Sequence, residues 1–92
     1  MKAQMSAEQI LDVAEKAIID AAEVMNSKNR SISIMQRTGM FAVALAFTQL
    51  LNTAGRTAFV KYTNEFDSFN RGIDSITVDG RVIYKCEEVE LS

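Results

Sequence analysis

Apolar residues recur every three or four positions in the first part of the chain, as on one face of a helix. The series is Ile10, Val13, Ala14, Ala17, Ala21, Val24 and Met25, and charged side chains occupy the other side. Ser6 and Gln9 have the spacing of a capping box, in which each side chain binds the other residue's backbone N–H. The pattern predicts a helix from about Ala7 to about Ser27, ended by turn-forming residues.

A second capping box, Ser33 with Gln36, predicts the start of a second helix. Its apolar residues surround nearly the whole circumference: Met40, Phe41, Val43, Leu45, Phe47, Leu50 and Leu51, with Gly39, Ala42, Ala44 and Ala46 between them. Asn52, Thr53 and Gly55 are typical of a helix end. A helix that is apolar all round must be covered all round. We therefore expect it to be central in the fold and to self-associate through Gly39, Val43, Phe47 and Leu50.

The segment after Gly55 fits two patterns. Phe59, Val60 and Tyr62 favour a strand within residues 56–63. A longer set has the three-and-four spacing of a helix face instead: Phe59, Tyr62, Phe66, Phe69 and Ile73. We predict the helix, which either begins near Thr57 or continues the second helix across Gly55.

Asp79-Gly80 between two β-prone segments predicts a hairpin, because this pair readily adopts the positive φ angles of a type I′ turn. With Val78 opposite Arg81, the register places Ile76 opposite Ile83 and Asp74 opposite Lys85. Both faces of the hairpin are partly apolar. We expect one face to pack on the helices and the other to be offered to a partner.

These elements predict a single α+β domain over residues 1–92, mainly helical. Two to three α-helices would surround the very apolar second helix, followed by a C-terminal β-hairpin. The apolar stretch 40–51 is shorter than the about 20 residues that span a bilayer. We therefore expect no membrane insertion.

The inventory of reactive side chains is small. The chain has no histidine and a single cysteine, Cys86, which excludes histidine-based triads and cysteine-rich metal sites. We interpret Glu8, Asp12 and Glu15 as a solvated helix face, and Cys86 as a buried structural residue. We accordingly predict no enzyme activity, no cofactor, no catalytic residue and no metal site. The lone cysteine and the lack of a signal-peptide pattern indicate a cytoplasmic location.

The preferred hypothesis is a protein-binding module: an adaptor, assembly factor or inhibitor that forms a homo-oligomer. Small inhibitors made by viruses and mobile elements share this profile. The candidate residues for a partner are Arg56, Lys61, Arg71, Arg81 and Tyr84. The order of the predicted elements also suggests a winged-helix-like nucleic-acid-binding regulator, with the third helix in a groove. The net charge of −2 argues against this alternative, because nucleic-acid-binding domains are usually basic.

Overall fold

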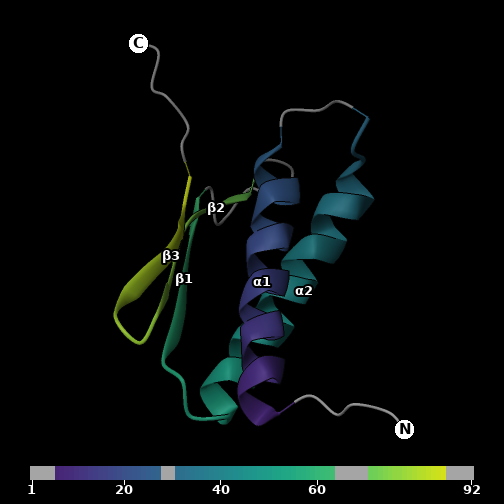
Figure 1. Ribbon diagram of the computed structural model, residues 1–92. Coiled ribbons are helices and arrows are strands. Elements are labelled where there is room, and N and C mark those ends of the chain that lie inside the picture. Colours follow the sequence, from purple (N-terminus) through teal and green to yellow (C-terminus); the bar gives the residue numbers. More distant parts are fainter. Residues whose placement is uncertain (1–5, 28–30, 64–70, 87–92) are drawn as a thin grey trace, which may run out of the picture.

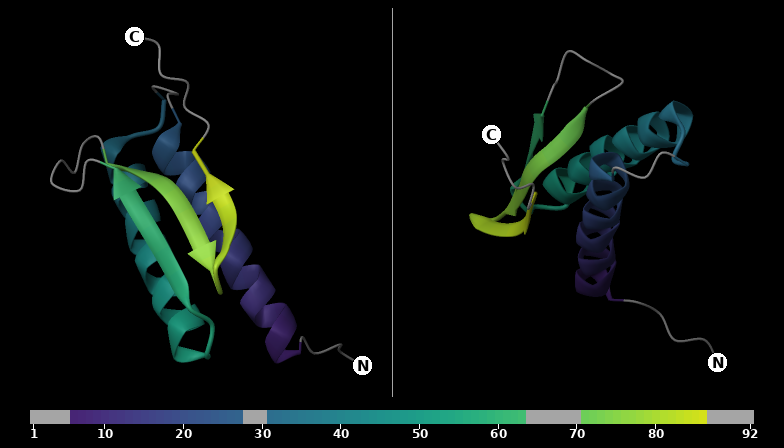
Figure 2. Two further views of the ribbon diagram at one scale, coloured as in Figure 1. Left: turned by 90° about the vertical axis from the view of Figure 1, so that its left-hand side faces the viewer. Right: turned by 90° about the horizontal axis from the view of Figure 1, so that it is seen from above.

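The computed structural model describes residues 6–27, 31–63 and 71–86. Helices α1 (Ala7–Asn26) and α2 (Ile34–Thr53) are followed by strands β1 (Ala58–Thr63), β2 (Gly72–Val78) and β3 (Arg81–Lys85). The strands form one antiparallel sheet in the order β1-β2-β3. The two helices lie side by side and antiparallel, with the sheet next to them (Figure 1). Figure 2 shows, in its left view, that the sheet lies across one side of the pair. The expected α+β fold class is confirmed.

Both predicted helix starts are confirmed by complete capping boxes. The Gln9 N–H donates to Ser6 Oγ at 3.1 Å, and the Ser6 N–H donates to Gln9 Oε1 at 2.8 Å. Ser33 and Gln36 make the same pair of bonds at 3.1 and 2.7 Å. Each box supplies partners for backbone groups that a helix start leaves unpaired.

The predicted third helix is wrong. Residues 58–63 form strand β1, and Gly55 with φ +104° ends the second helix rather than bending it. Of the other residues in the proposed helical stripe, Ile73 lies in β2, while Phe66 and Phe69 lie outside the described residues. The β-prone side chains prevail here because β2 provides a pairing partner that local sequence does not reveal. In the winged-helix hypothesis this third helix would enter the groove, and residues 58–63 form a strand in its place.

The C-terminal hairpin is confirmed, although its register differs in part. Asp79 and Gly80 have φ angles of 53° and 83°, and Val78 pairs with Arg81. A bulge between Ile76 and Thr77 then shifts the ladder, so Ile76 pairs with Tyr84 and Ser75 pairs with Lys85. The predicted pairs Ile76–Ile83 and Asp74–Lys85 are therefore wrong as register partners. Lys85 Nζ nevertheless lies 4.0 Å from Asp74 Oδ2.

The core lies between the helix pair and the inner face of the sheet. The buried apolar residues of α1 are Ala14, Ile18, Ala21, Ala22 and Met25, and those of the sheet are Ala58, Val60, Ile73, Ile76 and Val78. Helix α2 adds only Ala44 and Leu51 to this set. Of the two described helices, α2 is the more apolar, yet it has fewer fully buried residues than α1.

Two asparagines join the helix ends to the sheet. At the end of α1, Asn26 Nδ2 donates to the Ile73 carbonyl at 2.8 Å, and Asn26 Oδ1 accepts from the Ile73 N–H at 2.9 Å. Near the end of α2, Asn52 binds the backbone of Ala58 in the same way, at 3.1 and 2.9 Å. Each side-chain amide thus satisfies both backbone groups of one strand residue.

The beginning of α2 is bonded to the end of α1. The Arg37 guanidinium donates to the carbonyls of Met25 at 2.8 Å and Ser27 at 2.7 Å. These contacts satisfy carbonyls at the C-terminal end of α1, where positive charge is also favourable. Together with the Asn52 contacts, they hold α2 in the fold at both of its ends.

Candidate functional site

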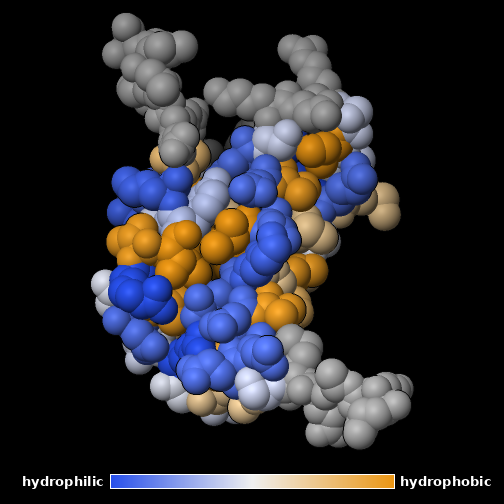
Figure 3. All heavy atoms as spheres, in the orientation of Figure 1, coloured by the Kyte–Doolittle hydropathy of each residue, from blue (hydrophilic) through white to orange (hydrophobic). Residues whose placement is uncertain are grey.

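An apolar surface extends along the helix pair on the side away from the sheet. In an α-helix successive residues are 100° apart, so positions on one side can be followed from the contacts of known side chains. On α1, Glu15 and Asn26 point to the side of the sheet, because they contact Arg56 and Ile73. Ile10, Val13 and Ala17 occupy the opposite side of α1. Figure 3 shows hydrophobic side chains on both sides of a hydrophilic strip, and those at the right lie on the side of the helix pair away from the sheet.

Helix α2 adds a matching row to this surface. Phe41 points toward the sheet, because its ring lies 5.1 Å from that of Tyr62 in β1. The opposite side of α2 carries the four residues predicted for self-association: Gly39, Val43, Phe47 and Leu50. We call these four, together with Ile10, Val13 and Ala17, the helix face.

Much of the helix face is open to solvent. Ile10, Val13 and Leu50 are 46%, 53% and 40% exposed, whereas Val43 and Phe47 are partly buried and also pack against the core. Space is free beside Gly39, since an added Cβ would meet nothing within 4 Å. Contiguous exposed apolar surface of this kind typically marks an interaction site.

The four α2 residues of this face are those predicted from the sequence, whereas Ile10 and Val13 were not among the residues predicted for self-association. The spacing placed Ile10 and Val13 on the apolar face of the first helix, and about half of each side chain is exposed. A signal was present in the sequence. The apolar positions of α1 form two neighbouring rows, one through Ala14 and Ile18 and one through Ile10 and Ala17. One packing partner covers only one such row.

The described residues contain one helix, α2, that is long and apolar enough to cross a membrane. Its mean hydropathy is 1.2, and only 11% of the apolar stretch is buried in the fold. Core helices of soluble proteins and signal sequences share this composition. The low buried share of α2 agrees with an apolar surface on this helix that the fold leaves uncovered.

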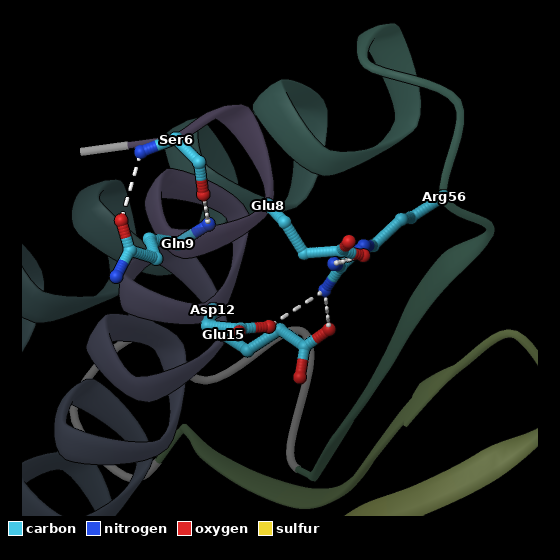
Figure 4. A network of polar contacts seen from close by, with 6 residues as sticks. All are labelled: Ser6, Glu8, Gln9, Asp12, Glu15 and Arg56. Carbon is cyan, nitrogen blue, oxygen red and sulfur yellow. Dashed lines mark hydrogen bonds and ion pairs between the residues drawn. The ribbon is translucent and has the colours of Figure 1, made fainter.

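A separate polar network surrounds Arg56, just after the end of α2 (Figure 4). Its guanidinium contacts Glu8 at 3.2 Å, Asp12 at 3.3 Å and also Glu15. The Arg56 and Glu15 side chains are each 14% exposed. The acidic face of α1, interpreted above as merely solvated, thus attaches the start of α1 to the loop before β1.

The charge state of Arg56 follows from these contacts. Burial disfavours the charged form, but the hydrogen bonds that Arg56 donates to Glu15 and Asp12, with the negative charge of these carboxylates, outweigh it and raise the pKa of Arg56 above its ordinary value. The Arg56 guanidinium is therefore charged, and three carboxylates of α1 contact it. These contacts argue against Arg56 as a residue that binds a partner.

Replacing Arg56 with glutamine is expected to lower the melting temperature by about 4 °C at low salt. The change leaves Glu8, Asp12 and Glu15 near one another without their cation. High salt should reduce the difference, because it screens charges. Lys16→Gln is the control, since Lys16 pairs with the exposed Asp20 at 3.5 Å and, within the described residues, has no other ion pair. Equal melting temperatures for the two variants would contradict a stabilising role of the network.

The structure places the other candidate partner residues at different points. Lys61 and Arg81 are exposed, on β1 and at the start of β3. The Arg71 guanidinium lies 4.2 Å from the centre of the Phe41 ring. The Tyr84 hydroxyl accepts a hydrogen bond from Asn26 at 2.8 Å, so it faces the fold. Lys61 is the candidate that the structure presents on the outer face of the sheet.

The described residues present little chemistry beyond these contacts. They contain no cluster of three or more histidine, cysteine, aspartate or glutamate side chains suited to a metal ion. Cys86 is a free thiol that is partly exposed, contrary to the expected burial. Burial raises the pKa of Tyr62 above its usual range, and this effect exceeds the opposing influence of Arg71.

No known protein family, curated protein or solved structure matches this chain.

Proposed function

We propose that this protein is a non-enzymatic protein-binding domain that self-associates through the helix face. The observation that carries the proposal is the apolar side of the helix pair, which the sheet does not cover. Burying apolar surface contributes about 25 cal/mol per Å², so covering this face with a second copy is favourable. A symmetric dimer would bring two helix pairs together as a four-helix arrangement.

The residue sizes on the helix face suit close packing between helices. Gly39 and Ala17 leave room for an approaching helix, while Phe47 and Leu50 supply large apolar side chains. Large and small side chains in alternation interdigitate well at such contacts. Charged residues stay at the margin, where Asp20 is exposed on α1.

The contacts of α2 within the fold favour a protein partner over lipid. Arg37 hydrogen-bonds to α1 at one end of the helix, and Asn52 holds β1 at the other. Leu51 is fully buried on the side facing the core. A membrane-spanning position of α2 would require all of these contacts to break. The proposed role is that of an adaptor, assembly factor or inhibitor.

Light scattering on the purified protein should give a mass near twice that of the 10.2 kDa chain. Leu50→Glu should weaken self-association about a hundredfold, because it places a charge in the proposed apolar contact. Leu45→Glu is a closely matched control: Leu45 is 42% exposed and Leu50 is 40% exposed, and they lie on different sides of α2. We expect Leu45→Glu to remain dimeric.

Two outcomes would contradict the proposal. One is a monomeric wild-type protein, and the other is a Leu50→Glu variant that remains a folded dimer. Flotation with vesicles of phosphatidylcholine and phosphatidylglycerol tests lipid as the alternative. Flotation that Leu50→Glu abolishes would assign the helix face to a membrane surface instead.

A further inference from the structure

The outer face of the sheet carries two short rows of side chains that run across the strands. The register pairs Thr77 with both Phe59 and Val82, which makes an apolar row. It pairs Ser75 with both Lys61 and Lys85, which makes a basic row. Paired residues in a sheet point to the same face, so each row is continuous.

This face points away from the core. The residues of β1 alternate, with Ala58 and Val60 buried and Phe59 and Lys61 exposed. Phe59 is 64% exposed and Val82 is 62% exposed, on either side of Thr77. Neighbouring strands are about 4.8 Å apart, so these two side chains are about 10 Å apart. The two rows are two residues apart along β1 and β2, or about 7 Å. Along β3 they are three residues apart, because the bulge adds one residue to that strand.

The charge of the outer face differs from that of α1. Lys61 is exposed, and the Lys85 side chain is 68% exposed, with Asp74 at 4.0 Å. Helix α1 instead carries a set of acidic residues: Glu8, Asp12, Glu15, Asp20 and Glu23. A basic row on a chain of net charge −2 therefore favours a negatively charged partner.

We propose that the outer sheet face binds an acidic protein segment in which carboxylates stand next to an apolar side chain. The apolar side chain would pack across Phe59 and Val82, and the carboxylates would pair with Lys61 and Lys85. The proposal rests on the protein-binding function above and does not require self-association. Phe59 is the one aromatic side chain in the two rows, whereas proteins that bind single-stranded nucleic acid usually stack several bases on aromatic rings.

The probe is a short fluorescein-labelled peptide of repeated Glu-Glu-Leu, and binding is followed by fluorescence anisotropy at low salt. We expect Lys61→Glu to weaken binding about fivefold, because it reverses a charge in the basic row. Lys16→Glu makes the same change on α1, where the Lys16 side chain is 76% exposed, and should leave binding within about twofold. The double change of Phe59 and Val82 to serine should weaken binding at least about tenfold.

Equal effects of Lys61→Glu and Lys16→Glu would overturn the proposal, and so would no binding by the wild-type protein. Tighter binding of an oligothymidylate of equal charge would assign the face to single-stranded nucleic acid and overturn it too. The measurement is repeated in the Leu50→Glu variant. Peptide binding should persist there, so failure of the sheet-face proposal is distinguishable from failure of the self-association proposal.

Discussion

Replacing Leu51 with alanine is expected to lower the free energy of unfolding by about 3 kcal/mol. Leu51 is 0% exposed and is the only large side chain of α2 that is fully buried. Removing it leaves a cavity where α2 meets the core. Because α2 contributes so few buried residues, other contacts can compensate little for the loss.

Leu45→Ala is the control for this prediction. Leu45 lies on the same helix but is 42% exposed, so the same substitution should cost less than about 1 kcal/mol. Urea unfolding followed by circular dichroism measures both changes. Protein concentration is kept low and equal, since self-association would stabilise the folded state. Similar losses of unfolding free energy for the two variants would show that Leu51 is not buried against the core as in the structure.

Replacing Asn26 with alanine should lower the free energy of unfolding by about 2–3 kcal/mol. The change removes the hydrogen bonds to the Ile73 carbonyl and to the Tyr84 hydroxyl, both at 2.8 Å, and the bond from the Ile73 N–H at 2.9 Å. Those partly buried groups would then lack a partner. The backbone of Gly72 lies close to the Asn26 side chain: a Cβ at position 72 would lie 2.4 Å from Asn26 Oδ1. A residue larger than glycine at position 72 would therefore displace the Asn26 side chain.

Asn52→Ala tests whether burial sets the size of the effect. Asn52 makes the same two bonds to Ala58 but is itself exposed, so water can replace part of what is lost. We expect about 1 kcal/mol for this variant. A loss of stability at Asn26 no greater than that at Asn52 would contradict the expected dependence on burial.

Local sequence signals determined the helix starts and the tight turn. Ser6 with Gln9, and Ser33 with Gln36, act within one helical turn, and Asp79-Gly80 acts within two residues. Each of these signals concerns a few neighbouring backbone groups. The physics that decides them is therefore contained in the local sequence.

Local sequence signals could not predict the conformation of residues 58–63 or the register of the hairpin. Phe59 and Tyr62 suit either a helix or a strand, and the choice depends on pairing with β2. The bulge between Ile76 and Thr77 likewise changed the partners of β3 beyond the first pair. Such pairings are set by contacts between segments distant along the chain.

The candidate surfaces likewise depended partly on the sequence and partly on the tertiary structure. The sequence by itself indicated that α2 is too apolar to be covered by its own fold, and it identified Gly39, Val43, Phe47 and Leu50. The tertiary structure decided that Ile10 and Val13 of α1 remain about half exposed on the side of the helix pair away from the sheet, and that Arg56 pairs with carboxylates of α1. Composition reveals how much apolar surface must be buried, whereas only the packing of the helices and sheet decides which part of it remains exposed.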